Sequence, residues 1–179
     1  MRRVATPLAL LGALSITAAP GIAQLGELQV GVVGSYGTSK AYGPGAGLVL
    51  GVATGRLAYV GLRWTYHAGA TTAGVTTRAQ VFAVDLGIDI PVRALEVVPG
   101  VSLGAMRFAQ RVGGAQAHKV EFLAAPGLAV EVHVARVAFI PELQYSLAGD
   151  PELAQPVRHR GLVASLRLVI PIEVGRIRR

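Results

Sequence analysis

Four histidines are the side chains of this sequence with the widest chemical scope, because imidazole can bind a metal ion or act as a general base. They are spread along the chain, at His67, His118, His133 and His159. None shows the His-x-His or His-x-x-x-His spacing that brings two imidazoles to one metal ion. The chain has no cysteine, which excludes thiolate metal sites and disulfides. We therefore expect no metal site, no cofactor and no enzymatic activity.

Charged residues offer a second kind of chemistry, because several of them fall on one face of an alternating segment. In residues 78–91, bulky apolar side chains occupy every second position, and small residues with two carboxylates, Asp85 and Asp89, occupy the others. Strict alternation over ten residues predicts a β-strand with different surroundings on its two faces. Our interpretation is that the bulky face meets lipid and the small, charged face lines a narrow barrel.

Seven other segments alternate in the same way, and none has a helical period. The eight predicted strands are residues 28–36, 46–53, 58–67, 78–91, 97–108, 120–132, 137–147 and 161–170. The connections alternate between long polar ones (37–45, 68–77, 109–119 and 148–160) and tight ones (54–57, 91–96 and 133–136). This asymmetry is typical of outer-membrane barrels. We predict an all-β fold, an eight-stranded antiparallel up-and-down transmembrane β-barrel, with an irregularity at Pro126 in mid-strand.

The N-terminus predicts export. Two arginines, Arg2 and Arg3, precede an apolar run at residues 4–16 and a small-residue site that ends at Ala23, as in a cleaved signal peptide. An uncleaved anchor helix is the alternative. Mean hydropathy is high, at +0.51, yet no later apolar run reaches the roughly 18–20 residues of a spanning helix. We predict a signal peptide over 1–23 and an outer-membrane barrel domain over 24–179, located in the bacterial outer membrane.

Charge bears on the partners. Removing Arg2 and Arg3 leaves 15 of the 17 basic residues against 10 acidic ones, a formal charge of +5. A basic chain can bind nucleic acid, but the export signal argues against that partner, and anionic lipid is the better candidate. Basic residues fall in or beside the long connections, where lipopolysaccharide phosphates would lie. The candidate contacts are Lys40, Arg78, Arg111, Lys119, Arg158 and Arg160, with Arg107 beside them.

The alternation places a set of charges in the barrel interior, where each must be paired or hydrated. The predicted lumen charge network is Arg63, Asp85, Glu121, Glu131, Glu142 and Arg167, and Glu27 and Asp89 also face inward. Placing the centre of the last long connection midway between Leu147 and Gly161 makes Glu142 and Arg167 a cross-strand pair. Six inward carboxylates then stand against two arginines, and water, raised pKa values or a misassigned strand must account for the excess.

These features resemble the small eight-stranded outer-membrane barrels of the outer membrane protein A and X type. The resemblance covers essentially the whole mature chain and is carried by the Gly21-Ile22-Ala23 site, the alternating strands, the loop asymmetry and Pro-Gly strand openings at residues 98–104 and 125–128. It implies a monomer inserted by the barrel-insertion machinery. Such barrels usually end in an aromatic residue, whereas this chain ends in Arg179. The His-x-Ser pair of the lipid A deacylating barrels is absent, because Gly69, Val120, Ala135 and Gly161 follow the histidines at that spacing.

The functional expectation is a structural, membrane-tethering or surface-interaction role, with the lumen plugged by polar side chains. One alternative is a small passive or gated pore, although eight strands leave no room for an open aqueous channel. A second alternative is a soluble periplasmic barrel that binds an apolar ligand. Outward aromatic residues near strand ends (Tyr36, Trp64, Tyr66 and Tyr145) fit a girdle at the membrane interface or the core of a soluble barrel equally well.

Overall fold

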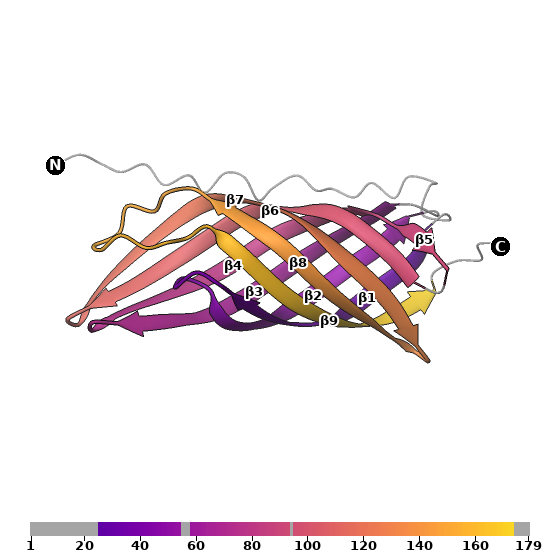
Figure 1. Ribbon diagram of the computed structural model, residues 1–179, viewed down its shortest axis with the longest axis horizontal. Helices are drawn as coiled ribbons and strands as arrows, with labels where there is room; N and C mark the ends of the chain where they lie inside the picture. Colours follow the sequence, from indigo (N-terminus) through magenta and orange to yellow (C-terminus); the bar gives the residue numbers. More distant parts are fainter. Residues whose placement is uncertain (1–24, 55–57, 94, 174–179) are drawn as a thin grey trace.

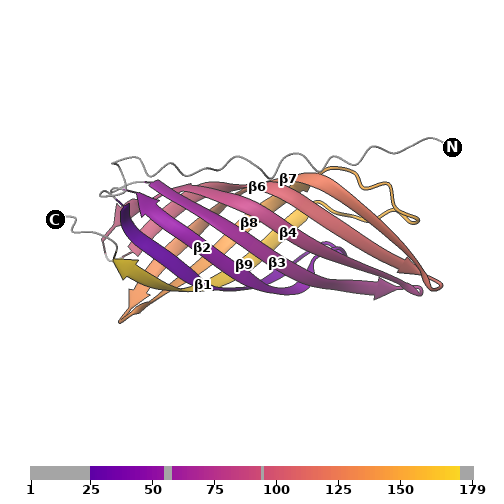
Figure 2. The same cartoon turned by 180° about the vertical axis from the view of Figure 1, so that it is seen from behind.

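Nine strands and no helix make up the part of the chain that the computed structural model describes, residues 25–54, 58–93 and 95–173 (Figures 1 and 2). The predicted signal peptide, most of the first tight turn and the C-terminal residues 174–179 lie outside these ranges. The strands are β1 (Leu25–Gly37), β2 (Gly43–Thr54), β3 (Ala58–Thr72), β4 (Val75–Ile88), β5 (Ile90–Val92), β6 (Leu95–Val112), β7 (Ala115–Val134), β8 (Val137–Ala148) and β9 (Gly161–Glu173).

The strands close into a barrel with eight strand positions around its circumference. Apart from β4 and β5, which do not pair with each other, strands that follow one another in the chain pair antiparallel, and β1 pairs with β9. The strand β5 continues the line of β4 after a break at Asp89, and both pair with β6, in the same register. Counted as one strand, β4 and β5 complete an eight-stranded up-and-down barrel, so the predicted fold class is confirmed.

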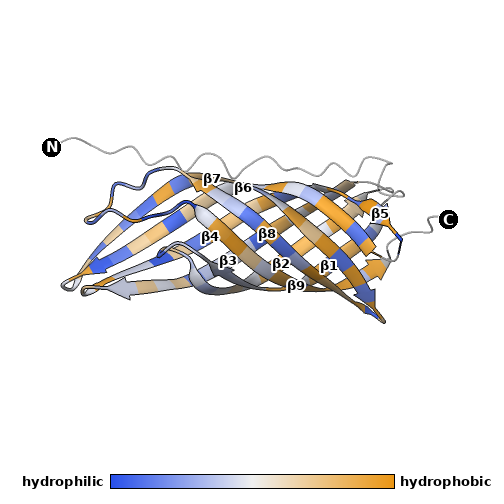
Figure 3. Ribbon diagram, viewed as in Figure 1, coloured by the Kyte–Doolittle hydropathy of each residue, from blue (hydrophilic) through white to orange (hydrophobic). Residues whose placement is uncertain are grey.

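The two faces of the wall follow the alternation of the sequence. In β4 the side chains of Val81, Ala83 and Asp85 are buried, whereas Phe82 and Val84 are exposed on the outside. Leu62 of β3 is likewise an apolar side chain on the outside: it is 58% exposed, whereas its neighbours Gly61 and Arg63 face inward. Hydrophobic colour is concentrated along the wall, and hydrophilic colour dominates the connection between β8 and β9 (Figure 3). No helix in the described ranges is long and apolar enough to cross a membrane, a criterion that does not bear on strands.

The two ends of the barrel differ. We call the end that holds Leu25, Thr54, Glu173 and the turn after β7 the terminal end, and the opposite end the loop end. At the loop end, two predicted long connections are wrong: residues 68–77 and 109–119 are mostly strand. The turns there are Ala73-Gly74 and Gly113-Gly114, all with positive φ, as two-residue hairpin turns require. The β3–β4 and β6–β7 hairpins therefore project beyond the other strands (Figure 1).

Prolines interrupt the backbone pairing between strands without changing the register. The pairing of β7 with β8 has gaps around Pro126 and Pro141, yet residues on either side keep one register. Pro99 lies in the gap between the β4–β6 and β5–β6 pairings. A proline lacks the N–H that a ladder needs, so a local loss of pairing is the expected effect. The irregularity predicted at Pro126 is thus a gap in the pairing with β8 and not a bulge.

A bulge does occur in β3, where the register with β4 shifts between His67 and Ala70. Gly69 lies in it with a φ of 67°, and a Cβ there would collide with the carbonyl oxygen of Thr77. We expect Gly69→Ala to lower the free energy of unfolding by at least about 1–2 kcal/mol, the cost of a left-handed backbone for a residue with a Cβ. Urea unfolding in lipid vesicles measures this.

Gly34→Ala is the matched control, because no atom lies within 4 Å of the Cβ position of Gly34. It should leave stability unchanged or slightly raised. Equal effects of the two substitutions would contradict the assignment of a strained bulge at Gly69.

Candidate functional site

The centre of the barrel interior holds a charged network around Arg63, which extends from β3 into the lumen. Its guanidinium forms ion pairs with Asp85 of β4 at 2.8 Å and with Glu142 of β8 at 2.7 Å. It also donates to the Gln144 side chain at 3.3 Å. Both carboxylates are almost fully buried, with side-chain exposures of 7% and 8%. One cation therefore joins strands on opposite sides of the lumen.

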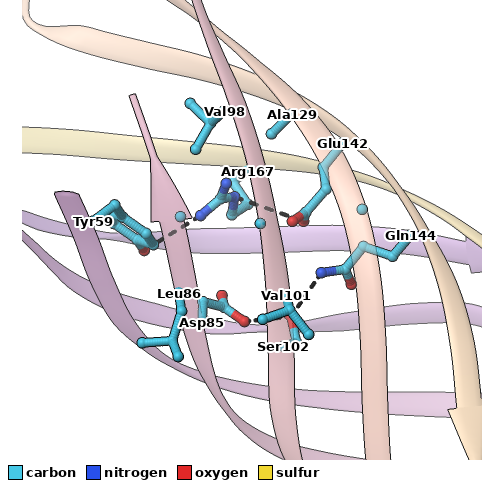
Figure 4. A pocket seen from close by; sticks show the side chains of 13 residues that line it. Tyr59, Asp85, Leu86, Val98, Val101, Ser102, Ala129, Glu142, Gln144 and Arg167 are labelled. Atoms are coloured by element: carbon cyan, nitrogen blue, oxygen red, sulfur yellow. Dashed lines mark hydrogen bonds and ion pairs between the residues drawn. The ribbon is translucent and has the colours of Figure 1, made fainter. Parts of the chain in front are cut away.

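Arg167 of β9 is the second cation of the network (Figure 4). Its Nε lies 3.8 Å from Glu142, its Nη1 donates to the hydroxyl of Tyr59 at 3.3 Å, and its guanidinium carbon lies 5.4 Å from the centre of that ring. Neutral groups complete the network: Ser102 donates to Asp85, Gln144 to Ser102, and Ser165 to Glu142. Two arginines thus balance two buried carboxylates, and hydroxyl and amide groups occupy most remaining hydrogen-bonding positions.

The register differs from the prediction by two residues. Ile140 faces Arg167 and Glu142 faces Ser165, so Glu142 and Arg167 are diagonal neighbours. The reason is that the last connection is not centred as assumed: Ser146 faces Gly161, while Leu147 and Ala148 continue to pair with β7. A shift of two residues keeps every side chain on its face, so both groups still point into the lumen and interact.

The other predicted lumen carboxylates do not join this network. Glu121 lies towards the loop end, beside Gly149. Glu131 lies at the terminal end, where its carboxylate contacts His133 at 3.1 Å and the Gln29 amide at 3.3 Å. Glu27 belongs to the same group, since the Gln29 amide also donates to it, at 3.0 Å. The inward carboxylates are therefore divided among three levels of the barrel.

A second buried cluster lies at the loop end. Tyr42, from the short connection between β1 and β2, is 1% exposed, and its hydroxyl contacts Ser146 and donates to the carbonyl oxygen of His159 at 3.0 Å. Its ring meets the His67 ring edge to face at 5.2 Å. Burial raises the pKa of Tyr42 to about 12, so the hydroxyl remains protonated and able to donate at neutral pH.

Residues 149–160, which connect β8 to β9, cover this cluster. The backbone of Gln155 is held by the side chain of Gln110 through hydrogen bonds of 2.9 and 3.1 Å. Leu153 and Val157 pack on the buried apolar residues below. Two cavities of about 20 and 30 Å³ lie near the two clusters, and each is large enough for a water molecule or two.

The predicted lipopolysaccharide contacts fall into two groups. Lys119 and Arg160 are engaged within the protein, with Glu152 at 3.4 Å and with Asp150 at 3.8 Å respectively. The remaining candidates are exposed and form no ion pair among the described residues: Lys40, Arg78, Arg111 and Arg158, with Arg107 beside them.

Three of these exposed cations lie close together on the outer face. Arg78 of β4 pairs with Ala109 of β6, and Arg107 and Arg111 flank Ala109 on the same face. We call Arg78, Arg107 and Arg111 the basic patch. It lies on the loop-end side of the exposed Phe82 and Phe122.

Sequence reasoning named the charges of the lumen but missed Tyr42, Tyr59 and His159 as parts of its closure. Tyr59 falls on the inward face of its strand, which the alternation shows. Tyr42 and His159 lie in connections, where no periodicity reports whether a side chain turns inward.

A closed, up-and-down, eight-stranded barrel with an apolar exterior and a charged interior is the architecture of the small outer-membrane barrels. No protein-family model and no curated protein sequence matches the chain. Solved structures, in contrast, do match it. Neisserial surface protein A superposes with a TM-score of 0.62 at 11% identity, over 83% of this chain and 96% of that one.

Two further structures agree on the fold. The N-terminal β-barrel domain of Pseudomonas aeruginosa OprF gives a TM-score of 0.61 at 10% identity, covering 83% of this chain and 98% of its own. A major outer membrane protein from Thermus thermophilus gives 0.62 at 10% identity, covering 82% and 99%. At such low identity the likeness establishes the architecture that the sequence patterns predicted.

Proposed function

We propose that this protein is an exported bacterial outer-membrane barrel with a sealed lumen, and that it has a structural, tethering and surface-interaction role. The observation that carries the proposal is an interior filled by a paired charge network and capped by Tyr42, inside a wall whose outward residues are apolar. The similar solved structure from Thermus thermophilus, which is named as a major outer membrane protein, supports the same location. The barrel acts as a monomer placed by the barrel-insertion machinery, with the loop end outside the cell.

The interior leaves little room for the alternatives. An apolar ligand of ordinary size needs a pocket of roughly 300 Å³ or more, whereas the two cavities near the lumen clusters measure about 20 and 30 Å³. An enzymatic role finds no support either: Ser146 and Ser165 form hydrogen bonds with Tyr42 and Glu142, and no hydrogen bond joins either serine to a histidine side chain among the described residues. A gated pore would require Tyr42 and residues 149–160 to move together.

The sealed lumen predicts that the purified barrel gives no single-channel conductance in planar bilayers at neutral pH. Arg63→Ala combined with Tyr42→Ala removes the central cation and the cap, and should produce conductance steps. The Tyr145→Ala variant is the control, since Tyr145 is 45% exposed on the outer face. Regular conductance steps from the unchanged protein would favour the gated pore over the sealed barrel.

Tethering rests on the basic patch. Facing residues of paired strands lie about 4.5–5.5 Å apart, so the three guanidinium groups can reach neighbouring phosphates. Arginine binds phosphate through two parallel hydrogen bonds. The patch lies where the apolar wall gives way to the projecting hairpins, the level at which lipid phosphates would meet the barrel. We therefore assign it to the phosphates of lipopolysaccharide.

Replacing Arg78, Arg107 and Arg111 together with Gln should abolish the extra thermal stability that the barrel gains in lipopolysaccharide-containing vesicles over phosphatidylcholine vesicles. The matched control is Arg93→Gln with Arg136→Gln, two exposed arginines in terminal-end turns. Equal loss in both variants would show only a general charge effect, and an unchanged gain in the triple variant would remove the assignment.

Surface interaction would fall to the projecting β3–β4 and β6–β7 hairpins. They are paired with each other through β4 and β6 out to Val75 and Val112, so they form one stiff four-stranded sheet and not independent loops. Loops on a rigid scaffold commonly carry binding functions, and a paired sheet presents its residues with still less freedom.

A further inference from the structure

The terminal mouth of the lumen holds a cluster of donor groups from strands on opposite walls. Glu27 comes from β1, and Glu131 and His133 come from β7, two strands separated by β8 and β9. One donor atom from each of the three side chains lies within 4.8 Å of the others. Ligands of a four-coordinate Zn²⁺ ion are bound at about 2.0–2.2 Å, which places neighbouring ligand atoms about 3.4 Å apart. The widest pair of donor atoms would therefore have to close by up to about 1.4 Å to bind one ion.

Gln29 provides a second, independent observation. Its side chain is 4% exposed and lies between Glu27 and Glu131, to which its Nε2 donates. Its Oε1 is buried without a hydrogen-bond partner among the described residues. A buried amide oxygen without a partner is costly. Rotation of the amide by half a turn would place this oxygen among the carboxylates, which is unfavourable unless a cation lies there and favourable if one does.

The negative charge of the terminal mouth also favours a bound cation. Asp89 and Glu96 lie close enough to interact electrostatically with Glu27 and Glu131, and Glu96 faces Glu131 directly across the β6–β7 pairing. Within residues 25–54, 58–93 and 95–173, no lysine or arginine forms an ion pair with any of these four carboxylates. Among the described residues, this negative charge is countered by His133 beside Glu131 and by Arg167 acting on Asp89, and a divalent cation would offset the remainder.

We propose that Glu27, Glu131 and His133 bind one divalent transition-metal ion at the terminal mouth, with the Gln29 amide oxygen as a further ligand. The imidazole decides the kind of ion, since mixed nitrogen and carboxylate donors suit Zn²⁺ or Mn²⁺, whereas Ca²⁺ and Mg²⁺ prefer oxygen alone. Bound there, the ion braces β1 against β7 across the lumen. Spacing rules could not reveal this site, because its ligands on the two walls lie far apart in the sequence, as the 102-residue separation of Gln29 and Glu131 illustrates.

The test is calorimetric titration of the full barrel in detergent, purified without an oligohistidine tag, with Zn²⁺, Mn²⁺, Ca²⁺ and Mg²⁺ in turn. We expect one Zn²⁺ or Mn²⁺ per chain and at least tenfold weaker binding of Ca²⁺ and Mg²⁺. Glu131→Gln and His133→Ala should each weaken binding at least tenfold. His118→Ala is the matched control, since His118 is a histidine towards the other end of the same strand, and it should change nothing.

Co²⁺ substitution gives a second readout, because the visible absorption of Co²⁺ reports its coordination geometry and should be lost or shifted in His133→Ala. Circular dichroism verifies that each variant is folded, and Glu27→Gln replaces Glu131→Gln if the latter does not fold. The proposal is overturned if the intact barrel does not bind Zn²⁺ or Mn²⁺, if His118→Ala weakens binding as much as His133→Ala, or if all four cations bind alike and independently of His133.

Discussion

Replacing Arg63 with Met should lower the free energy of unfolding by about 3–5 kcal/mol, the usual cost of removing one partner from a buried ion pair. The substitution leaves Asp85 without an ion-pair partner and leaves Glu142 with only the 3.8 Å contact to Arg167. Urea unfolding in lipid vesicles, followed by the fluorescence of Trp64, the single tryptophan, gives the measurement.

Two comparisons sharpen this prediction. Lys119→Met removes a pair whose side chains are 40% and 90% exposed, and exposed pairs contribute about 0–1 kcal/mol. Adding Asp85→Leu and Glu142→Leu to Arg63→Met should recover much of the loss, since both carboxylates that Arg63 neutralised are then gone. If Arg63→Met costs no more than Lys119→Met, the network does not hold the barrel together.

Leu62→Arg should destabilise the barrel in vesicles by about 2–4 kcal/mol, the cost of an arginine on the lipid face near the bilayer midplane. Leu62 is 58% exposed and faces Leu50 and Val84 on the neighbouring strands, in the middle of the apolar wall. A soluble barrel would gain an exposed charge there at almost no cost, so the same substitution separates the two interpretations of the alternating pattern.

Thr71→Arg supplies the matched control. Thr71 is exposed on the projecting β3–β4 hairpin and faces Thr76, outside the apolar wall, so its effect should stay within about 0.5 kcal/mol. A negligible effect of Leu62→Arg, or release of the exported protein into a detergent-free extract, would contradict the membrane placement of the wall.

The strand walls could be predicted because a period of two is a local property of the sequence. Phe82 and Asp85 report opposite faces without any knowledge of the neighbouring strands. The projecting hairpins could not be predicted in the same way, since polar residues on both faces of residues 68–77 resemble a loop. The Ala73-Gly74 and Gly113-Gly114 pairs were the available signal, because both suit turns that need positive φ.

The charge balance of the lumen depended on distance along the barrel axis, which alternation does not report. Six inward carboxylates stand against two arginines, but the charges balance at the centre of the lumen, where the network has two of each. The structure pairs Asp85 and Glu142 with Arg63 and Arg167 and leaves Glu27, Asp89 and Glu131 at one mouth and Glu121 near the other. The height of a residue along the barrel axis follows from the strand register, and the register depends on where each turn is centred. A two-residue error in the last connection keeps every side chain on the same face, so the alternation of the sequence could not reveal it.

The gaps around Pro126 and Pro141 make the closed wall unequal around its circumference. The β7–β8 seam retains eight cross-strand pairs, against seventeen in the β6–β7 seam beside it. Because cooperative opening begins where backbone bonding is sparsest, the barrel would part along this seam first. Opening between β7 and β8 would expose Glu142 and Gln144, so this seam would be the first route by which the charged network of the lumen meets its surroundings.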